Sequence, residues 1–544
     1  MIFLIKNHHS LFIFNNFGSL LSSQKHTQMK KSIFSLVLFL FLSSTVFGQD
    51  QEGKIQLALN FSQPIKERKK TDELTFVVKD KSSGFIVGLK KKHGKGYYIR
   101  HYDQQLNLVQ ELEYKLSGKK GEIKDAFLLK NGDLCILEFY NNSRKKTLDY
   151  YANISPTDHF AFKKKLLLSI SRKKAKGRSS FSLNEDGDTH GNFSMSANKK
   201  YFALTIELDA KKMEKHQIYV FDNELHKIYQ NTFERKLADR KFRLENVDIN
   251  EKDGTLLLLG KSYTRKKKKK GGKYQFELYK IKANGMKRLF FDSKDKYIGS
   301  LSIKYKEDKV FCVGFYSEKN DYRYKGLVFF DIDLEQMKLK NSVYSPFSKQ
   351  FLIDKYGKAK QKELHNIRLD HIFYDGTNFV ITAEERGYHI YTSFRPAGPN
   401  GGGGMSTTVV AFYNDIIVTK LNKQGKMIWA RNINKSQQGK PSYNSYTALF
   451  TNNHIYLFLN AAKNAKKLKN KRLAFNTGTF SSYNLYAIVF DTQGKYQYEK
   501  IVDKKKTKSV FMAGNGIVSN NHKDVIFPGK NKSKTRLLKI HIPD

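Results

Sequence analysis

The segment Asn414 to Asn434, NDIIVTKLNKQGKMIWARNIN, consists of two extended halves joined by a tight turn. The run Ile416 to Leu421 is rich in β-branched and apolar residues on successive positions, which is typical of a strand covered on both faces. In the turn, Asn422 can hydrogen-bond its own backbone, and Gly425 tolerates a positive φ. The stretch therefore predicts a β-hairpin.

Variants of this hairpin recur along the chain. A Gly aligns with Gly425 in two variants, Ile281 to Leu289 and Phe490 to Tyr498. Leu occupies the aligned position in three others, which begin at Tyr102, Phe221 and Phe330. A second hairpin precedes each variant, and about eight of these are recognisable by a polar turn between two apolar runs. They begin at Leu74, Ala126, Phe193, Val247, Leu301, His371, Thr447 and Gly516. Four strands in about 50 residues is the period typical of a propeller blade.

We therefore predict an all-β chain that forms a closed β-propeller of about eight four-stranded blades over residues 54–544. After the last hairpin only the strand Thr535 to Ile542 remains, so the final blade lacks one strand. The segment Lys54 to Ser62 is an unassigned strand at the other end, and we expect it to complete that blade and cover its edge. An open array of separate sandwiches is the alternative, but it calls for Pro/Gly/Ser-rich linkers, which the sequence lacks.

The stretch DIIVTKLNKQGKMIW resembles the third and fourth strands of secreted bacterial β-propeller repeats, in the broad group that includes the pyrroloquinoline-quinone-like repeats. The resemblance implies an architecture and no particular activity, because propellers serve as binding proteins, scaffolds and enzymes. The sequence has no WD dipeptide, kelch glycine pair or recurring blade Trp that would assign a subfamily.

The N-terminal region predicts export. Residues 29–48 have two Lys, an apolar run and small residues before Gln49, as a signal peptide does, and the apolar run is too short to span a bilayer. We expect translation to start at Met29, with residues 1–28 as a leader outside the protein proper; a genuine long leader is the alternative. The mature chain, with insertions at 261–273, 384–414 and 461–484, would be periplasmic or extracellular and monomeric. Cys135 and Cys312 lie in different repeats, which favours free thiols over a disulfide.

The chain has 98 Lys and Arg against 51 Asp and Glu, a net charge of +47. In a four-stranded blade, the connections between the second and third strands emerge on the same face as those between blades, and here both kinds are rich in Lys. We predict that this basic face binds polyanions such as acidic polysaccharide, lipopolysaccharide, anionic lipid or extracellular nucleic acid. A solvated Lys fringe that only aids solubility is the alternative. The candidate anion-binding residues are Lys90, Lys91, Lys92, Arg144, Arg265, Lys266, Lys267, Lys268, Lys269, Lys270, Arg395, Lys466, Lys467, Lys469, Lys471 and Arg472.

The insertion 384–414 is the most irregular stretch. Arg386, Tyr388, His389 and Tyr391 are weak candidates for acid/base work on an acidic sugar, and a flexible lid over the centre of the ring is the alternative interpretation. No residue spacing predicts a metal site or a cofactor. We thus expect a non-catalytic binding propeller, with a propeller lyase or hydrolase and a protein-docking scaffold as the alternatives.

Overall fold

The structure is a computed structural model. It describes residues 51–544 except 68–70, 92–95, 119–120, 176–190, 211–212, 238–240, 264–273, 294, 307–308, 319–322, 361–363, 396–403, 478–482 and 520–521. The expected leader and signal peptide therefore lie outside the described residues. The chain divides into residues 1–51 and a compact unit of residues 52–544, and strand β1 (Gln51–Glu52) straddles the division. The architecture below is that of the second unit.

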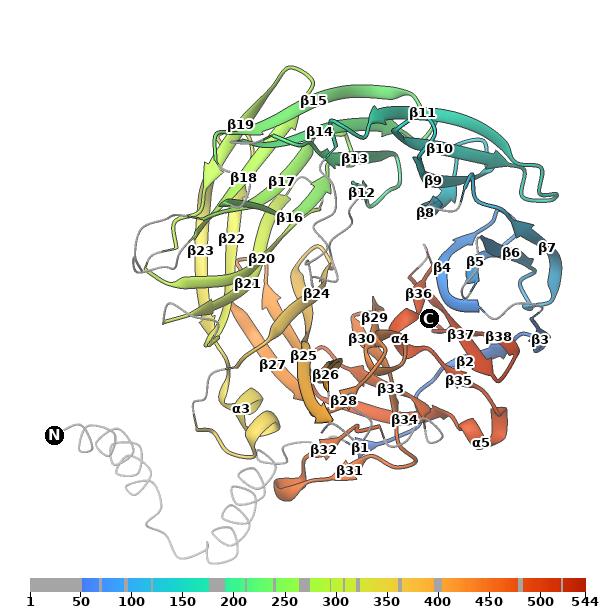
Figure 1. Ribbon diagram of the computed structural model, residues 1–544. Coiled ribbons are helices and arrows are strands. Elements are labelled where there is room, and N and C mark those ends of the chain that lie inside the picture. The colour runs from blue at the N-terminus through green and yellow to red at the C-terminus, as the bar shows by residue number, and fades with distance from the viewer. Residues whose placement is uncertain are drawn as a thin grey trace, which may run out of the picture. The chain divides into compact units, whose positions relative to one another are not determined.

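Residues 52–544 form an eight-bladed β-propeller, as the repeats predict (Figure 1). Each of the first five blades is a four-stranded antiparallel meander whose strands follow chain order. Blade 1 has β4 (Thr71–Lys79), β5 (Phe85–Lys91), β6 (Tyr97–Tyr102) and β7 (Leu108–Tyr114), and blade 2 has β8 (Gly121–Leu128), β9 (Leu134–Asn142), β10 (Thr147–Ser155) and β11 (Lys163–Ser171). Blade 3 has β12 (Asn192–Met195), β13 (Tyr201–Glu207), β14 (Glu214–Asp222) and β15 (Lys227–Arg235). Blade 4 has β16 (Phe242–Ile249), β17 (Leu256–Tyr263), β18 (Tyr274–Lys282) and β19 (Gly285–Phe290), and blade 5 has β20 (Tyr297–Lys306), β21 (Lys309–Ser317), β22 (Gly326–Asp333) and β23 (Lys338–Pro346).

The last three blades carry additions to this plan. Blade 6 has β24 (Ile367–Tyr374), β25 (Asn378–Arg395), β26 (Gly404–Asn422), β27 (Met427–Ile433) and the short β28 (Gln437–Gln438). Blade 7 has β29 (Tyr446–Thr451), β30 (His454–Ala461), β33 (Asn484–Phe490) and β34 (Tyr496–Val502), with the small hairpin β31 (Lys466–Lys467) and β32 (Leu473–Ala474) inserted. Blade 8 has β35 (Val510–Phe511), β36 (Ile517–Val518), β37 (Asp524–Asn531) and β38 (Lys534–His541). The short helices are α3 (Lys349–Tyr356), α4 (Pro441–Asn444), α5 (Lys504–Thr507), η2 (Lys469–Lys471) and η4 (Ala513–Asn515).

The N-terminal segment closes the ring in the way the sequence predicts. Strand β2 (Ala58–Phe61) pairs with β38 as the outer strand of blade 8, and β3 (Ile65–Lys66) pairs with the start of β38. The segment also touches blade 7, because the Gly53 amide donates to the Tyr498 carbonyl at 3.2 Å. Residues from the two ends of the chain thus share one blade, which leaves no gap in the ring.

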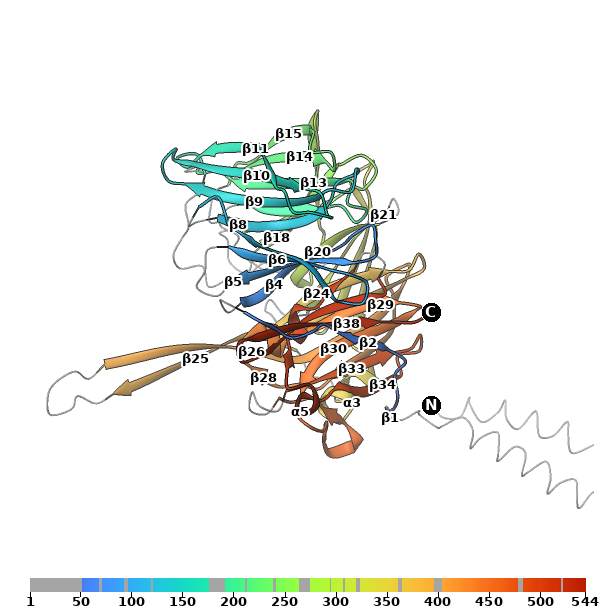
Figure 2. The ribbon, with the colours of Figure 1, turned by 90° about the vertical axis from the view of Figure 1, so that its right-hand side faces the viewer.

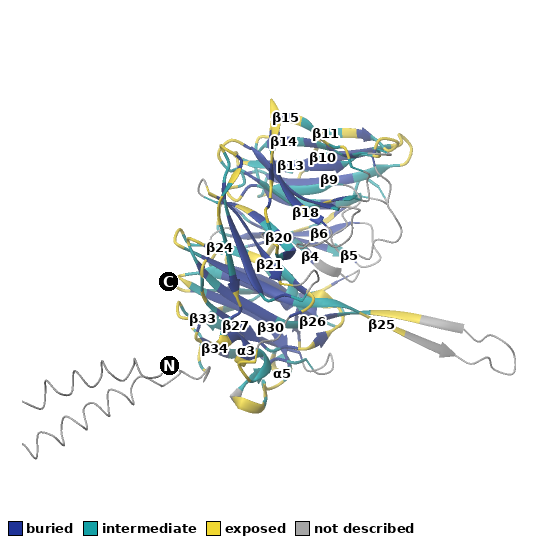
Figure 3. Ribbon diagram, turned by 90° about the vertical axis from the view of Figure 1, so that its left-hand side faces the viewer, coloured by how far each residue is buried: buried dark blue, intermediate teal, exposed yellow. Residues whose placement is uncertain are grey.

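The core lies between blades and not inside any one of them. Each neighbouring pair of blades buries its own cluster of aliphatic and aromatic side chains, and the pairing of blade 8 with blade 1 does so through Leu74, Phe85, Ile526 and Leu537. Strands with apolar residues on both faces are needed for this, since each blade is covered on both sides. Figure 3 shows buried strands through the ring and exposed residues at its turns.

The opening hairpin forms as predicted, with a positive φ at Gly425. In two of its variants Leu adopts the same backbone conformation, with φ of 65° at Leu106 and at Leu225. These Leu side chains are buried between blades, which offsets the strain of the left-handed conformation. The third Leu variant differs from the alignment, because the positive φ falls on Met337 and not on Leu334.

Strands β25 and β26 are far longer than the others and continue past the blade as a two-stranded ribbon. Their pairing runs from Asn378 with Asn422 to Arg395 with Gly404. The ribbon projects from the ring and does not fold over its centre, so the lid interpretation of 384–414 is wrong for the described residues (Figure 2). The physical reason is that Thr, Val, Ile and Tyr in both halves favour extended pairing. Among the described residues, no helix is both long and apolar enough to cross a membrane.

Candidate functional site

Several of the predicted anion-binding residues lie exposed on connections of the expected kind. Arg144, with its neighbours Lys145 and Lys146, is exposed between β9 and β10. Lys466, Lys467 and Lys469 are exposed on the insertion between β30 and β33. The interblade connections add exposed cations at Arg172, Lys173, Lys174, Lys505, Lys506 and Lys508. Within the described part of the chain, none of these side chains has a carboxylate within ion-pair distance.

Other candidates are placed differently. Lys91 is buried, forms an ion pair with Glu113 and lies 4.6 Å from the Tyr98 ring, so it is not a surface cation. Lys90 is half-buried, and Arg472 donates to the backbone carbonyl of Lys355 at 2.7 Å, which fixes the insertion beside α3. Lys92 and the run 265–270 lie outside the described residues, as do the side chains of Arg395 and Lys471.

Carboxylates are numerous in the opposite turns, between the third and fourth strands, where they hold the backbone. Asp222 accepts from the amides of Glu224 and His226 at 2.9 and 2.8 Å, and Asp491 accepts from those of Gln493 and Lys495 at 2.8 and 2.9 Å. The sequence pattern of the repeat thus places Asp in these turns for a structural reason. These turns also carry exposed lysines, such as Lys423, Lys426 and Lys495, so their carboxylates lie among positive charges.

The four weak catalytic candidates do not converge on one point. Tyr388 pairs across the ribbon with Ala411 and His389 with Val410, so their side chains leave opposite faces of the ribbon. The His389 ring packs against the Phe412 ring at a tilt of 33°, with centroids 4.6 Å apart, and Tyr391 is exposed further out. Arg386 belongs to a different environment at the base of the ribbon.

That base holds a buried network of charges on the inner side of blade 6. Glu384 and Lys435 have fully buried side chains 2.6 Å apart, and Lys435 Nζ also donates to the Asn444 carbonyl at 2.6 Å. Ser445 Oγ donates to the second oxygen of Glu384 at 2.8 Å. Burial raises the pKa of Glu384 and lowers the pKa of Lys435, while the attraction between the two groups opposes both shifts.

Arg386 and Asp370 extend this network toward the inner strand β24. Arg386 Nη1 lies 3.0 Å from Asp370 Oδ1, and Tyr446 Oη donates to Asp370 Oδ2 at 2.8 Å. The register between β24 and β25 shifts at Asp370, and this β-bulge turns its carboxylate toward blade 7. Burial raises the pKa of Asp370, and Arg386 opposes that effect.

A second ionic cluster holds the other side of the ribbon base. Glu385, next to Glu384 on β25, pairs with Lys355 at 2.9 Å, and Lys355 also pairs with Asp415 at 2.6 Å. Burial alone would lower the pKa of Lys355, but the two carboxylates outweigh it and raise that pKa above its ordinary value. Glu384 and Glu385 thus pair with different lysines, Lys435 and Lys355, at a point where the register between β25 and β26 shifts, and they hold the ribbon base at two places.

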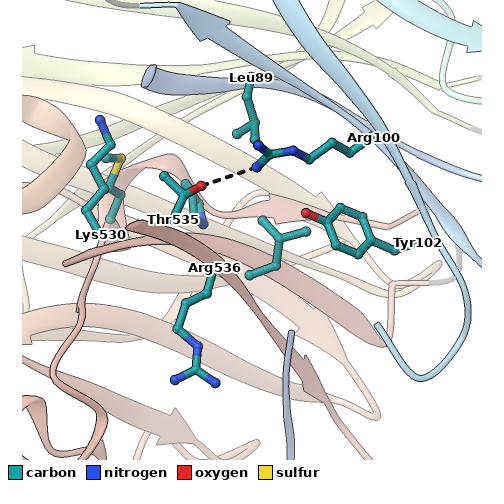
Figure 4. Close-up of a pocket in the computed structure, with 9 residues that line it drawn as sticks. Leu89, Arg100, Tyr102, Lys530, Thr535 and Arg536 are labelled. Atoms are coloured by element: carbon teal, nitrogen blue, oxygen red, sulfur yellow. Dashed lines mark hydrogen bonds between the residues drawn. The ribbon is translucent and has the colours of Figure 1, made fainter. Parts of the chain in front are cut away.

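A small pocket lies at the seam between blade 8 and blade 1 (Figure 4). Arg100 is buried there, donates to Glu111 at 2.6 Å and reaches Thr535 Oγ1 at 3.2 Å. Thr535 in turn donates to Glu67 at 2.8 Å, and burial raises the pKa of Tyr102 to about 12. These contacts satisfy the guanidinium with protein groups, so the pocket is part of the ring closure.

Sequence reasoning found Arg386 but missed the carboxylates and the lysine around it. The available signal was the pair Glu384 and Glu385 directly after the largely apolar segment Phe379 to Ala383, where no loop residues had yet begun. Within the described residues, no group of three or more potential metal ligands occurs. Cys135 and Cys312 are free and buried.

Comparison with known proteins yields similarity of fold only. No family model and no curated protein sequence matches the chain. Similar solved structures include the β-propeller domain of the Trilobed protease from Pyrococcus furiosus, at 10% identity over 77% of this chain and 94% of that one, with a TM-score of 0.36. An acylaminoacyl peptidase is 8% identical over 84% of this chain and 57% of that one (TM-score 0.36), and the Bombyx mori GH32 β-fructofuranosidase is 11% identical over 89% and 93% (TM-score 0.25). Nothing about activity follows at these levels of similarity.

Proposed function

We propose that this chain is an exported binding propeller whose second-to-third and interblade connections form a basic face for an anionic polymer of the cell envelope or its surroundings. The observation that carries the proposal is the set of exposed lysines and arginines on those connections, which have no carboxylate partner in the described structure. An exposed cation without a partner can replace the counterions condensed on a polyanion, and the release of those counterions favours binding.

The composition of these connections favours loose attraction over a shaped site. Lys466, Lys467 and Lys469 are point charges on flexible stems, whereas Arg reads a phosphate or carboxylate with two parallel hydrogen bonds. The proposed ligand is therefore recognised by its charge density, and acidic polysaccharide is the class that the proposed location favours.

Binding of the full chain to heparin, used as an acidic polysaccharide probe, tests the proposal. We expect affinity to fall steeply with added NaCl, and Lys466→Gln/Lys467→Gln/Lys469→Gln to weaken binding by roughly tenfold. The matched control is Lys423→Gln/Lys426→Gln/Lys495→Gln, three exposed lysines on third-to-fourth turns, which should change affinity by less than about twofold. Equal loss in both triple variants, or binding that ignores salt, would overturn the proposal.

A further inference from the structure

Lys435 and Glu384 are shielded from water more completely than any other lysine–carboxylate pair that the structure describes. Neither side chain has any exposed area, and Nζ lies 2.6 Å from Oε1. In the pair that Lys355 forms with Asp415, also at 2.6 Å, the side chains are 9% and 13% exposed. A site without water is where separated charges cost the most free energy.

The pair can hold its proton on either partner. With the proton on Nζ it is an ion pair, and with the proton on the carboxyl group it is a neutral amine beside a neutral acid. Burial favours the neutral arrangement, because it lowers the pKa of Lys435 and raises the pKa of Glu384, although the attraction between the two groups opposes both shifts. A neutral, desolvated lysine amine is a nucleophile, and a protonated carboxyl group is an electrophile that it can attack.

The contacts around the two groups suit attack of the amine on the carboxyl carbon. Nζ touches Oε1 of Glu384, and the carbon Cδ is one covalent bond away from that contact. Ser445 Oγ donates to the other oxygen, Oε2, at 2.8 Å, and Arg386 Nη1 lies 4.0 Å from it. Both groups would stabilise the negative charge that Oε2 acquires in a tetrahedral intermediate. The Asn444 carbonyl accepts from Nζ at 2.6 Å and holds the amine in place.

We propose that Lys435 and Glu384 condense into an amide, which forms a covalent cross-link between β25 and the segment that follows β27. Nζ forms a bond to Cδ, and the bond from Cδ to Oε1 breaks. Oε1 leaves as water with the proton of the carboxyl group and one proton of the amine, and the other amine proton stays on the amide nitrogen. A carboxylic acid is a weak electrophile, so the newly folded chain holds the ion pair and the bond forms slowly afterwards.

Lys355 provides a comparison beside the same strand. It lies 2.6 Å from Asp415 and 2.9 Å from Glu385, as close to carboxylates as Lys435 is to Glu384. Those two carboxylates raise the pKa of Lys355 above its ordinary value, so its amine keeps its proton and is not a nucleophile. A short distance alone is therefore insufficient, and we expect no amide at Lys355.

The amide closes a loop that contains the whole ribbon. Glu384 and Lys435 are 51 residues apart in the sequence, and the outer parts of β25 and β26 lie between them. A cross-link restricts the unfolded chain as a disulfide does, and the chain has no disulfide, because Cys135 and Cys312 are free. An aged, linked chain should therefore unfold at a higher urea concentration than a newly folded one.

Mass spectrometry of the full chain tests the proposal. After incubation of the folded chain at neutral pH, its mass should be lower by that of one water molecule than the mass of the same chain kept in urea. Trypsin should then release the peptide 369–386 joined to a peptide that begins at Asn432, with Lys435 left uncleaved. Lys355 should be cleaved as in an unlinked chain. The peptide map uses the unaltered chain, so it decides the question even if a variant fails to fold.

Substitutions identify the reacting groups. Lys435→Arg keeps a cation but removes the amine, and it should abolish the loss of water, whereas Lys355→Arg should leave that loss unchanged. Ser445→Ala should slow the loss several-fold, because Oε2 then lacks its hydrogen-bond donor. An incubated chain that keeps its full mass and is cleaved at Lys435 would overturn the inference, as would an equal loss of water in Lys435→Arg.

Discussion

The base and the outer part of the ribbon are built from the same two strands but differ in their charges. At the base, four charged side chains are held close together in ion pairs and hydrogen bonds. They are Glu384, Glu385 and Arg386 on β25 and Asp415 on β26. Further out, as far as Phe394, the strands continue with Tyr, Ile, Thr and Val and without Asp, Glu, Lys or Arg. Ion pairs determine the conformation of the base, whereas the conformation of the outer part depends only on the preference of its residues for extended structure.

The difference shows how a propeller can carry a rigid projection. A buried ion pair adds little net stability, since desolvation of the two ions offsets their attraction, but its geometry admits few alternatives. The pairs at the base therefore fix the direction of the ribbon, and the outer strands are left free to meet another surface.

Removal of one partner at the base should give the largest effect. Lys435→Met removes the cation 2.6 Å from the buried Glu384 carboxylate and leaves only the more distant Arg386, 4.0 Å away, so we expect a loss of about 3 kcal/mol in the free energy of unfolding. Urea unfolding followed by circular dichroism measures it. The double variant Lys435→Met/Glu384→Met should regain most of the loss, because an apolar pair is comparable in stability to a buried ion pair.

An exposed ion pair supplies the matched control for that experiment. Lys282 and Asp253 lie 3.0 Å apart and are each nearly half exposed, so Lys282→Met should cost no more than about 1 kcal/mol. If Lys435→Met were equally mild, the network at the base would not be held by its charges, and the contrast between base and ribbon would lose its physical basis.

The other end of β26 offers a second contrast, between a covered turn and an open one. Gly425 has φ of 82°, and a Cβ there would lie 2.1 Å from the Phe329 ring of blade 5. Gly285 stands at the same place in its hairpin, with φ of 152° and nothing within 4 Å of an added Cβ. We expect Gly425→Ala to reduce the free energy of unfolding by about 2–3 kcal/mol and Gly285→Ala by about 1 kcal/mol.

Thermal unfolding of the two variants side by side measures this difference. Equal losses would mean that backbone conformation alone sets the requirement for Gly, and that the neighbouring blade makes no contribution. The aligned glycines look equivalent in the sequence, so the measurement also tests what the repeat pattern can reveal.

The repeat pattern predicted the ring, the blades and the closing strand because these depend on local features: apolar runs, turn residues and their spacing. It could not predict the ribbon base, because Asp370, Glu384 and Lys435 meet only after three strands and a connection have been placed in space. The irregular composition of 384–414 also concealed a regular ribbon, since all of its described residues belong to the two strands β25 and β26.

The sequence also did not predict which individual lysines and arginines are exposed. Lys91 and Lys466 both belong to Lys-rich loops in the sequence, yet the first points inward to Glu113 and the second is exposed. The exposure of such a lysine depends on where the neighbouring strand ends, because alternate residues of a strand face opposite sides. Composition can thus predict a basic connection without telling which of its side chains reach solvent.

The smallest effect is expected at His371, which follows Asp370 on β24 and whose ring centroid lies 6.3 Å from that of Tyr446. Burial lowers its pKa to about 4, and the charges of Lys304 and Arg386 act in the same direction. The folded state thus favours the neutral imidazole, whereas the unfolded chain takes up a proton near pH 6.5. Stability from this group is present above pH 6.5 and is lost as the pH falls toward 4.

Unfolding measured between pH 7 and 4 should therefore show a shallower loss of stability in His371→Gln than in the unaltered chain. Neighbouring groups desolvate the imidazole, but the residue as a whole is exposed to solvent, which screens the effect, so the difference should be modest. Lys304→Gln should raise the pKa of His371 toward its ordinary value in an NMR titration, since one of the neighbouring positive charges is removed. If His371→Gln and the unaltered chain gave the same pH profile, the fold would not change the pKa of His371. Strongly shifted pKa values would then be confined to the buried network.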